Sequence, residues 1–333
     1  MSLTSLLKGS GTSQKEFQAI IREIIPNKKS FNTYSGKEAF SKAEYVISVP
    51  YNLSKSYNST VVGTGFDYLA RIMLARVVKK NRDESYTNLT AINGIWTLSK
   101  LSNNNRAVKK VERKLIKTIK KLKAYSNNNK PINELALDVC FLAKLEFIYR
   151  SSYLPDTPIE KYFFDEPDYE IIKDLELLCD VFQEKFISTI LNPTSDIIYN
   201  PHFGVASSYV GGADGDVIVD GTLYDFKTGK GIGYKWQEVA QIVGYYLLNQ
   251  ISIEIKNADD DYFVDDSYQR LDIKRLALYR ARYGEIEYID ISCFDKNQLE
   301  LTKKKLIHYF YEHPNFSKPM IESLHILRAL AES

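Results

Sequence analysis

Residues 210–229 read VGGADGDVIVDGTLYDFKTG, and this stretch decides the fold that the sequence predicts. An Asp-Gly pair at residues 220–221 separates two apolar runs, a pattern typical of a β-hairpin with a two-residue turn. With this turn, Val219 lies opposite Thr222 in the neighbouring strand. The register of the whole hairpin follows from that one pair, because side chains along a strand alternate between the two faces.

Counting outward from the turn places Asp216 opposite Asp225, and Asp214 opposite Lys227. All four side chains then share one face of the hairpin, with directly opposed Cβ atoms about 5 Å apart. Three acids at such spacing repel one another unless a cation lies between them. A hard divalent cation with oxygen ligands would relieve that repulsion, so the hairpin is a candidate metal site.

The remaining sequence predicts a mainly helical first half and an α/β second half. Helices are expected at residues 14–25, 63–78, 106–123, 132–149, 169–191, 236–249 and 296–311, and strands at residues 197–199, 209–219, 223–227, 276–282 and 285–291. This order predicts an α/β or α+β fold with a boundary near residue 165. Residues 1–165 are expected to form a helical region that shapes a substrate channel, and residues 166–333 a second, sheet-containing region.

Composition excludes several classes of protein. The 333 residues carry a formal net charge of +2, so bulk charge gives no argument for nucleic acid. Three widely separated cysteines argue against a disulfide framework or an iron–sulfur cluster, and the four histidines lack zinc-ligand spacing. The sequence has no long apolar run, so we expect neither a signal peptide nor a membrane span, and a cytoplasmic location.

The helix expected at residues 106–123 is strongly basic, with nine lysines and arginines against one acid, Glu112. An apolar stripe at steps of three and four residues would pack on the core. The charged remainder is either a solvated outer face or a phosphate-contacting surface that lines the substrate channel.

An aspartate lies on one predicted strand, Asp-x-Lys on the next, and Gln-x-x-x-Tyr on the helix that follows. This order of motifs resembles that of the PD-(D/E)XK nuclease superfamily. The resemblance is strongest to the branch that contains RecB-type nuclease domains and the CRISPR-adaptation nucleases, and it covers residues 197–291. The matching residues are Asp214 or Asp216, then Asp225 and Lys227, and then Gln241 and Tyr245.

This resemblance implies a restriction-endonuclease-like core, with a mixed central sheet flanked by helices, that hydrolyses DNA with Mg²⁺ or Mn²⁺. Asp216 and Asp225 are the favoured metal ligands, with Asp214 as a close competitor. Lys227 would orient or help to deprotonate the attacking water and would stabilise developing negative charge. These roles are those of a deoxyribonuclease.

The same resemblance gives Gln241 and Tyr245 the role of positioning the scissile strand. Lys230 and Lys235 are expected to contact phosphate from the loop after the hairpin, and Arg282 is expected either to contact the substrate backbone or to be structural. The acidic run at residues 259–261 is interpreted as a solvated loop rather than a metal site.

Asp67 is a weaker candidate, because it stands where related nucleases often carry a histidine. The favoured explanation is instead an acid in the first turn of a helix that begins at the glycines of residues 63 and 65, where the macrodipole stabilises it.

One alternative is a catalytically degenerate nuclease fold, acting as a DNA-binding or structural subunit of a phage or DNA-processing complex. A second is a metal-binding hydrolase that is not a nuclease. The presence of both Asp225 and Lys227 favours the enzyme. DNA is the expected partner, with no membrane. RNA in place of DNA, single-stranded, duplex or branched substrates, exonuclease or endonuclease action, and protein partners are all left open.

Overall fold

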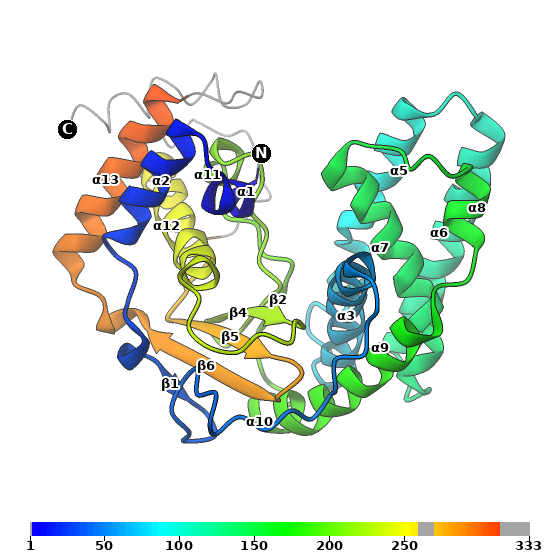
Figure 1. Ribbon diagram of the computed structural model, residues 1–333, viewed down its shortest axis with the longest axis horizontal. Helices are drawn as coiled ribbons and strands as arrows, with labels where there is room; N and C mark the ends of the chain where they lie inside the picture. Colours follow the sequence, from blue (N-terminus) through cyan, green and yellow to red (C-terminus); the bar gives the residue numbers. More distant parts are fainter. Residues whose placement is uncertain (1, 259–269, 314–333) are drawn as a thin grey trace.

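The computed structural model describes residues 2–258 and 270–313, and it has a mixed α/β architecture (Figure 1). The acidic run at residues 259–261 lies outside the described residues. None of the helices in the described part of the chain combines the length and the apolar character needed to cross a bilayer.

One six-stranded sheet runs through the structure in the order β1-β6-β5-β4-β3-β2. Its strands are β1 (Asn32–Thr33), β2 (Ile197–Tyr199), β3 (Val217–Val219), β4 (Thr222–Lys227), β5 (Arg275–Arg280) and β6 (Glu285–Asp290). Strands β4 and β5 pair in parallel, whereas every other neighbouring pair is antiparallel. The sheet is therefore mixed, as expected, and β4 lies in its interior with a partner on each side.

The hairpin of β3 and β4 has the predicted register, with Val219 opposite Thr222. Asp220 and Gly221, between the strands, have φ angles of 48° and 78°. A two-residue turn of type I′ requires positive φ at both central positions, a conformation that aspartate tolerates and glycine adopts freely. The Asp-Gly pair thus sets the alignment of the central strand β4 through local chemistry alone.

The expectation of a long strand over residues 209–219 is wrong. A short helix, α11 (Ala206–Tyr209), precedes a turn in which Gly211 and Gly212 both have positive φ, and β3 begins only at Val217. Asp214 is not paired with Lys227, because the pairing of β3 with β4 ends at Val217 and Tyr224; on its other side, Asp214 forms an isolated antiparallel bridge with His202. The consecutive glycines turn the chain between α11 and residues 214–216, which run beside residues 200–202.

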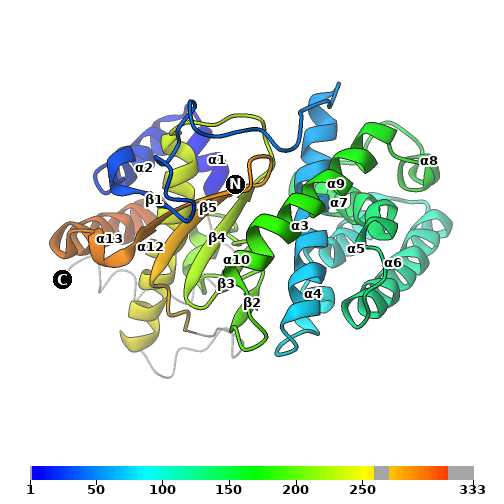
Figure 2. The same cartoon turned by 90° about the horizontal axis from the view of Figure 1, so that it is seen from below.

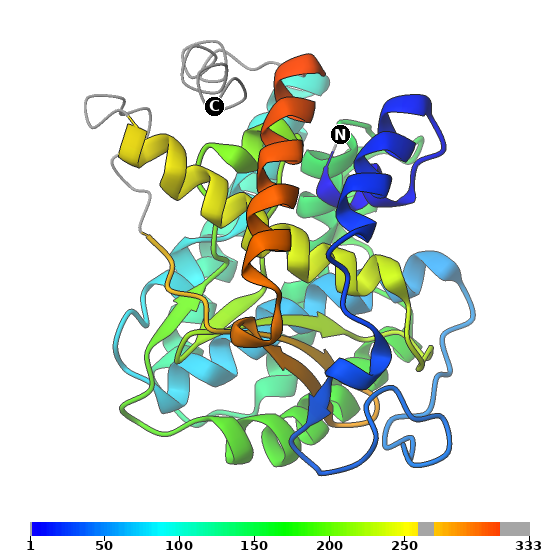
Figure 3. The same ribbon diagram turned by 90° about the vertical axis from the view of Figure 1, so that its left-hand side faces the viewer.

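Two layers of helix cover the two faces of the sheet, and each has its own apolar core. One face carries α1 (Leu3–Lys8), α2 (Thr12–Arg22), α12 (Trp236–Ala258) and α13 (Lys296–Glu312). Figure 3 shows α2 and α13 lying beside each other over α12. The first forty residues therefore pack with the last described ones, so the division expected at residue 165 is not the one that the packing makes.

The other face carries the helical part of the molecule. Its elements are α3 (Ser56–Val77), α4 (Glu84–Thr87), α5 (Thr90–Leu101), α6 (Asn105–Ser126), α7 (Ala136–Ser151), α8 (Ile159–Phe164), α9 (Tyr169–Val181), a π-helix at Phe182–Ile187 and α10 (Ser188–Ile190). Helix α3 is the central one, since it packs against α7, α9 and α6 and also touches β4. It begins at Ser56, so Gly63 and Gly65 lie inside the helix and do not form its entry turn.

Short 3-10 turns complete the structure at Lys28–Ser30, Ile132–Leu135 and Ile291–Cys293. The second hairpin, β5 and β6, turns at Tyr283 and Gly284 as predicted, with Gly284 at a φ of 64°. This hairpin supplies the parallel partner of β4, and so it fixes the far side of the strand that carries the predicted site.

Candidate active site

Asp225 and Lys227 occupy alternate positions on β4 and therefore point to the same face of the sheet. Asp225 is buried, with 4% of its surface exposed, because β4 lies in the interior of the sheet and α12 packs against it. The Lys227 Nζ lies 2.5 Å from Oδ2 of Asp225, and the lysine side chain is partly exposed. The central strand thus presents a carboxylate and an ammonium group together at its C-terminal end.

Asp216 stands directly before β3 and brings a second carboxylate to this place. Its Oδ2 accepts a hydrogen bond of 2.5 Å from the backbone N–H of Phe226, between Asp225 and Lys227. Burial raises the pKa of Asp216 well above its ordinary value, and the negative charges of Asp225 and then Asp67 raise it further. The two acids favoured from the sequence do therefore lie beside each other.

Helix α12 holds the lysine in place. Oε1 of Gln241 accepts a hydrogen bond of 3.0 Å from Nζ of Lys227, and Nε2 of Gln241 donates one of 2.7 Å to the hydroxyl of Tyr245. Tyr245 is 5% exposed and stacks on Phe203 at 4.8 Å between ring centroids. Burial, and then the charge of Asp225, raise the pKa of Tyr245 well above its ordinary value. Gln241 and Tyr245 share a helix face, as predicted, and in this structure their side chains position Lys227.

Asp67 is a third carboxylate at the site, contributed by the helical part. It lies in the middle of α3 and not in its first turn, so the macrodipole explanation is wrong. Its Oδ2 lies 2.5 Å from Nη2 of Arg71, one helical turn further on, and Arg71 also hydrogen-bonds Oδ1 of Asn200 at 3.2 Å. Burial raises the pKa of Asp67, although Arg71 lowers it. Helix α3 is thereby tied to the sheet beside Asp216.

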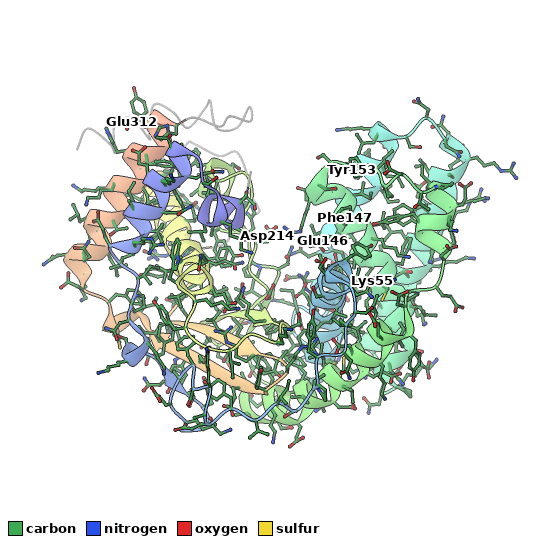
Figure 4. The ribbon with its side chains drawn as sticks, in the orientation of Figure 1. Lys55, Glu146, Phe147, Tyr153, Asp214 and Glu312 are labelled. Carbon is green, nitrogen blue, oxygen red and sulfur yellow. The ribbon has the colours of Figure 1, made fainter. Side chains whose placement is uncertain are left out.

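Asp214 is displaced from the hairpin but remains at the rim of the site. Its charge raises the pKa of Tyr245 and also that of Arg150, a residue of α7 that the sequence analysis did not single out. Figure 4 shows Asp214 and Glu146 facing each other from the sheet part and the helical part. Glu146 binds the Nε of Arg150 through its Oε1 at 2.6 Å. Helix α7 therefore contributes to the electrostatics of the site.

The other basic candidates lie elsewhere. Arg282 is 1% exposed and binds both oxygens of Asp174, at 2.8 and 2.6 Å, so its guanidinium group is held in a buried ion pair. Lys235 is exposed but pairs with Glu238 at 2.9 Å. Lys230 is exposed, with its ammonium group 5.1 Å from the ring centre of Tyr51. Of these three, Lys230 alone stays available near the end of β4 without an acidic partner among the described residues.

The basic helix α6 does not line the site. It packs against α3, α4, α5 and α8, and Figures 1 and 2 place it on the side of the helical part that is remote from the sheet. Lys121 pairs with Asp138 at 2.7 Å, and Lys114 donates to the carbonyl of Phe163 at 3.0 Å. The remaining lysines project into solvent around the apolar stripe, which corrects the expectation that this helix lines a substrate channel.

The three carboxylates, of which Asp225 is buried and Asp67 and Asp216 are partly exposed, fit a hard cation. Oδ1 of Asp67 and Oδ2 of Asp225 are buried and have no hydrogen-bond donor in suitable geometry. The Lys227 ammonium group lies close to Oδ2 of Asp225 as an ion pair. Unpaired buried oxygens are costly, and a divalent cation with carboxylate and water ligands would satisfy them. The site residues thus carry the donor chemistry that Mg²⁺ or Mn²⁺ requires.

The carboxylates do not form a closed three-ligand cage. Across residues 2–258 and 270–313, one group of three acids or histidines has ligand atoms all within 4.8 Å of one another, namely Glu16, Glu312 and His313. These three side chains are exposed, and Figure 4 shows Glu312 far from Asp214. Mg²⁺ commonly keeps several waters and uses one or two carboxylates, so a pair such as Asp216 and Asp225 is sufficient.

Comparison of the chain with family models, with curated proteins and with solved structures finds no match.

Proposed function

We propose that this protein is a divalent-metal-dependent nuclease that hydrolyses phosphodiester bonds in DNA, with a core of the PD-(D/E)XK type. The observation that carries the proposal is the grouping of Asp216, Asp225 and Lys227 at one end of the central hairpin. A carboxylate pair and an ammonium group in a largely buried position form a set that phosphodiester hydrolysis needs. The mixed sheet with helices on both faces agrees with that type of core.

Asp216 and Asp225 would hold Mg²⁺ or Mn²⁺, with Asp67 as a further acid beside Asp216. A metal at this position supplies an activated water and neutralises charge on the phosphate oxygens. The raised pKa of Asp216 means that its proton must leave before the carboxylate can act as a ligand. Cleavage should therefore increase with pH until that proton is lost.

Lys227 stabilises negative charge that develops on the phosphate oxygens and orients the attacking water. Its ammonium group is held by Gln241 on one side and by Asp225 on the other, so it is positioned before substrate arrives. Tyr245 acts through Gln241, because its hydroxyl accepts the amide hydrogen bond while its ring stacks on Phe203. Gln241 and Tyr245 are positioning residues in this scheme.

The proposal is tested by incubating the purified protein with linear duplex, circular duplex and single-stranded DNA, and with RNA, in Mg²⁺, Mn²⁺ or EDTA. We expect metal-dependent cleavage of DNA that Asp225→Asn abolishes. Asp180→Asn is the matched control, since Asp180 is an exposed acid on α9, and it should cleave like the wild type. Binding without cleavage in every metal would instead identify a catalytically degenerate nucleic-acid-binding protein. Cleavage that persists in EDTA or in Asp225→Asn would refute the proposed site.

A further inference from the structure

Arg150, near the end of α7, is a cation on the helical side of the candidate active site. Its side chain is 53% exposed, whereas its partner Glu146 is 10% exposed. Desolvation opposes its charge, but the negative charges of Glu146 and Asp214 outweigh this and raise the pKa of Arg150. Its charge in turn lowers the pKa of Asp67. One guanidinium group therefore interacts with acids of both the helical part and the sheet part.

The guanidinium is held from one side only. Oε1 of Glu146 accepts a hydrogen bond of 2.6 Å from Nε of Arg150, and Oε2 of Glu146 accepts one of 2.6 Å from the hydroxyl of Tyr68. The Tyr68 hydroxyl accepts in turn from the backbone N–H of Ala91 at 3.1 Å, which links α3, α5 and α7. In the part of the chain that the structure describes, the two Nη nitrogens of Arg150 have no hydrogen-bond partner.

This arrangement suits an anion with several oxygens. A guanidinium group presents a planar fork that matches phosphate, and a fork fixed by a buried glutamate loses little freedom on binding. A nucleic acid strand that reaches Asp216 and Asp225 must also pass the acids Asp67 and Asp214, which repel it. A cation on the opposite wall would offset that repulsion and draw the strand toward the carboxylates.

We propose that Arg150 binds a backbone phosphate of the nucleic acid, next to the scissile one, through its two Nη nitrogens. This inference rests on the proposed nuclease function and gives the helical part a direct role in substrate binding. It differs from the simpler view of Glu146 and Arg150 as a helix-stabilising pair four residues apart, because such a pair would not alter substrate affinity. Glu146 and Tyr68 then act as positioning residues for Arg150.

The test compares wild type, Arg150→Ala and Arg150→Lys, with Arg113→Ala as the matched control. Arg113 is an exposed arginine on α6, a helix on the side of the helical part that is remote from the sheet (Figure 2). The substrate is a labelled single-stranded oligonucleotide and, separately, its duplex, cleaved in Mg²⁺. We expect Arg150→Ala to raise KM about tenfold or more, since a charge-assisted contact is lost. Arg150→Lys should recover part of this loss, because it keeps the charge but not the fork.

The salt dependence of binding, measured in EDTA, gives a second readout that a structural role would not move. Loss of one phosphate contact should reduce the slope of log K against log salt by about 0.7 for single strands and about 0.9 for duplex. The melting temperature of each variant verifies that it is folded. If Arg150→Ala does not fold, Arg150→Gln takes its place in both measurements.

The outcomes separate the two proposals. If the wild type cleaves but Arg150→Ala and Arg113→Ala share its KM and salt slope, the role of Arg150 is overturned and the nuclease function stands. If the wild type neither binds nor cleaves any nucleic acid, both proposals fail together. A rise in KM and a reduced slope for Arg150→Ala alone support the phosphate contact.

Discussion

The Nζ of Lys227 lies 2.5 Å from Oδ2 of Asp225, its neighbour two residues earlier on the same strand. The same nitrogen donates to Gln241 on α12 at 3.0 Å. A cation thus already lies against a buried carboxylate that we propose as a metal ligand. A divalent metal and the lysine ammonium would both neutralise Asp225, so the two cations are coupled through this one side chain.

Replacing this lysine should make the metal more important for stability. Lys227→Met leaves Asp225 buried without its counter-charge, so the free energy of unfolding in EDTA should fall by about 3 kcal/mol. Manganese should then stabilise Lys227→Met more than it stabilises the wild type, while cleavage falls by at least about a hundredfold. Denaturant unfolding with and without Mn²⁺ measures the first effect. Lys235→Met is the control, because Lys235 is an exposed lysine paired with Glu238. Equal stabilisation of the wild type and of Lys227→Met by Mn²⁺ would contradict the coupling between the metal and the lysine.

The titration of Asp216 should change the stability of the protein with pH in the direction opposite to that of most carboxylates. Its pKa is raised in the folded protein, first by burial and then by Asp225 and Asp67, whereas an unfolded aspartate has a pKa of about 3.9. The folded state therefore holds a proton that the unfolded state releases. This stabilisation is complete below about pH 4 and is lost as the pH rises through the folded pKa.

Asp216→Asn should consequently be more stable than the wild type at neutral pH in EDTA, with a difference that shrinks toward about pH 4. Urea unfolding of both proteins across this pH range measures the difference directly. Asp180→Asn, at an exposed position, should track the wild type throughout. A constant offset between wild type and Asp216→Asn at all pH values would show that the Asp216 carboxyl does not titrate abnormally.

Asp214 and Asp216 should differ in metal binding. Asp216 lies against Asp225 and accepts from the N–H of Phe226, whereas Asp214 bridges to His202 and interacts with Arg150. Asp216→Asn should therefore weaken manganese binding in calorimetric titration more than Asp214→Asn does. The reverse order would make Asp214 the ligand and would require the segment before β3 to rearrange when metal binds.

The sheet side of the site follows from local rules in the sequence. An Asp-Gly turn sets the register of β3 and β4, and alternation along a strand puts Asp225 and Lys227 on one face. Helical spacing likewise puts Gln241 and Tyr245 on one side of α12. These relationships involve neighbours in sequence or in one hairpin, which is why pattern alone was sufficient.

The helical side of the site depends on packing between distant segments, and no local pattern specifies it. Asp67 reaches the sheet because α3 contacts β4, and α7 packs against α3, so that Glu146 faces Asp214 (Figure 4) and Arg150 interacts with its charge. A signal for Asp67 does exist in the sequence, since it stands among apolar residues of a buried helix, with Arg71 four positions later as its counter-charge. An acid in such a place needs a partner or a function. The bend at residues 211–212 was missed because alternation beyond it still read as a strand.

Arg282 should matter for stability and not for substrate binding. It binds both oxygens of Asp174, and its Nε donates to the carbonyl of Thr228 at 2.6 Å. Arg282→Met leaves Asp174 buried and unpaired, which should cost about 3–5 kcal/mol of unfolding free energy. The double variant Arg282→Met with Asp174→Leu should recover much of that loss, because neither charge then remains. Chemical denaturation measures both effects, and an increased KM with unchanged stability would restore Arg282 as a substrate contact.

Gly94 on α5 should control the position of Arg150 through the contact between α5 and α7. A Cβ atom at Gly94 would lie within 2.3 Å of the carbonyl oxygen of Leu145, the residue before Glu146. Gly94→Ala must therefore push the two helices apart, at a cost of about 1–3 kcal/mol in unfolding free energy. The displacement should also move Glu146 and weaken binding of a labelled oligonucleotide in EDTA.

Gly63→Ala is the control for this change, because Gly63 also lies inside a helix but its added Cβ would meet Thr228 Oγ1 at an ordinary 3.4 Å. That variant should be as stable as the wild type or more stable by up to about 1 kcal/mol, since alanine favours helix more than glycine does. Thermal unfolding measures the stability of the wild type, Gly94→Ala and Gly63→Ala, and fluorescence anisotropy measures their affinity for the oligonucleotide. If Gly94→Ala loses stability but binds the oligonucleotide as tightly as the wild type, the position of α7 does not control substrate binding through Arg150.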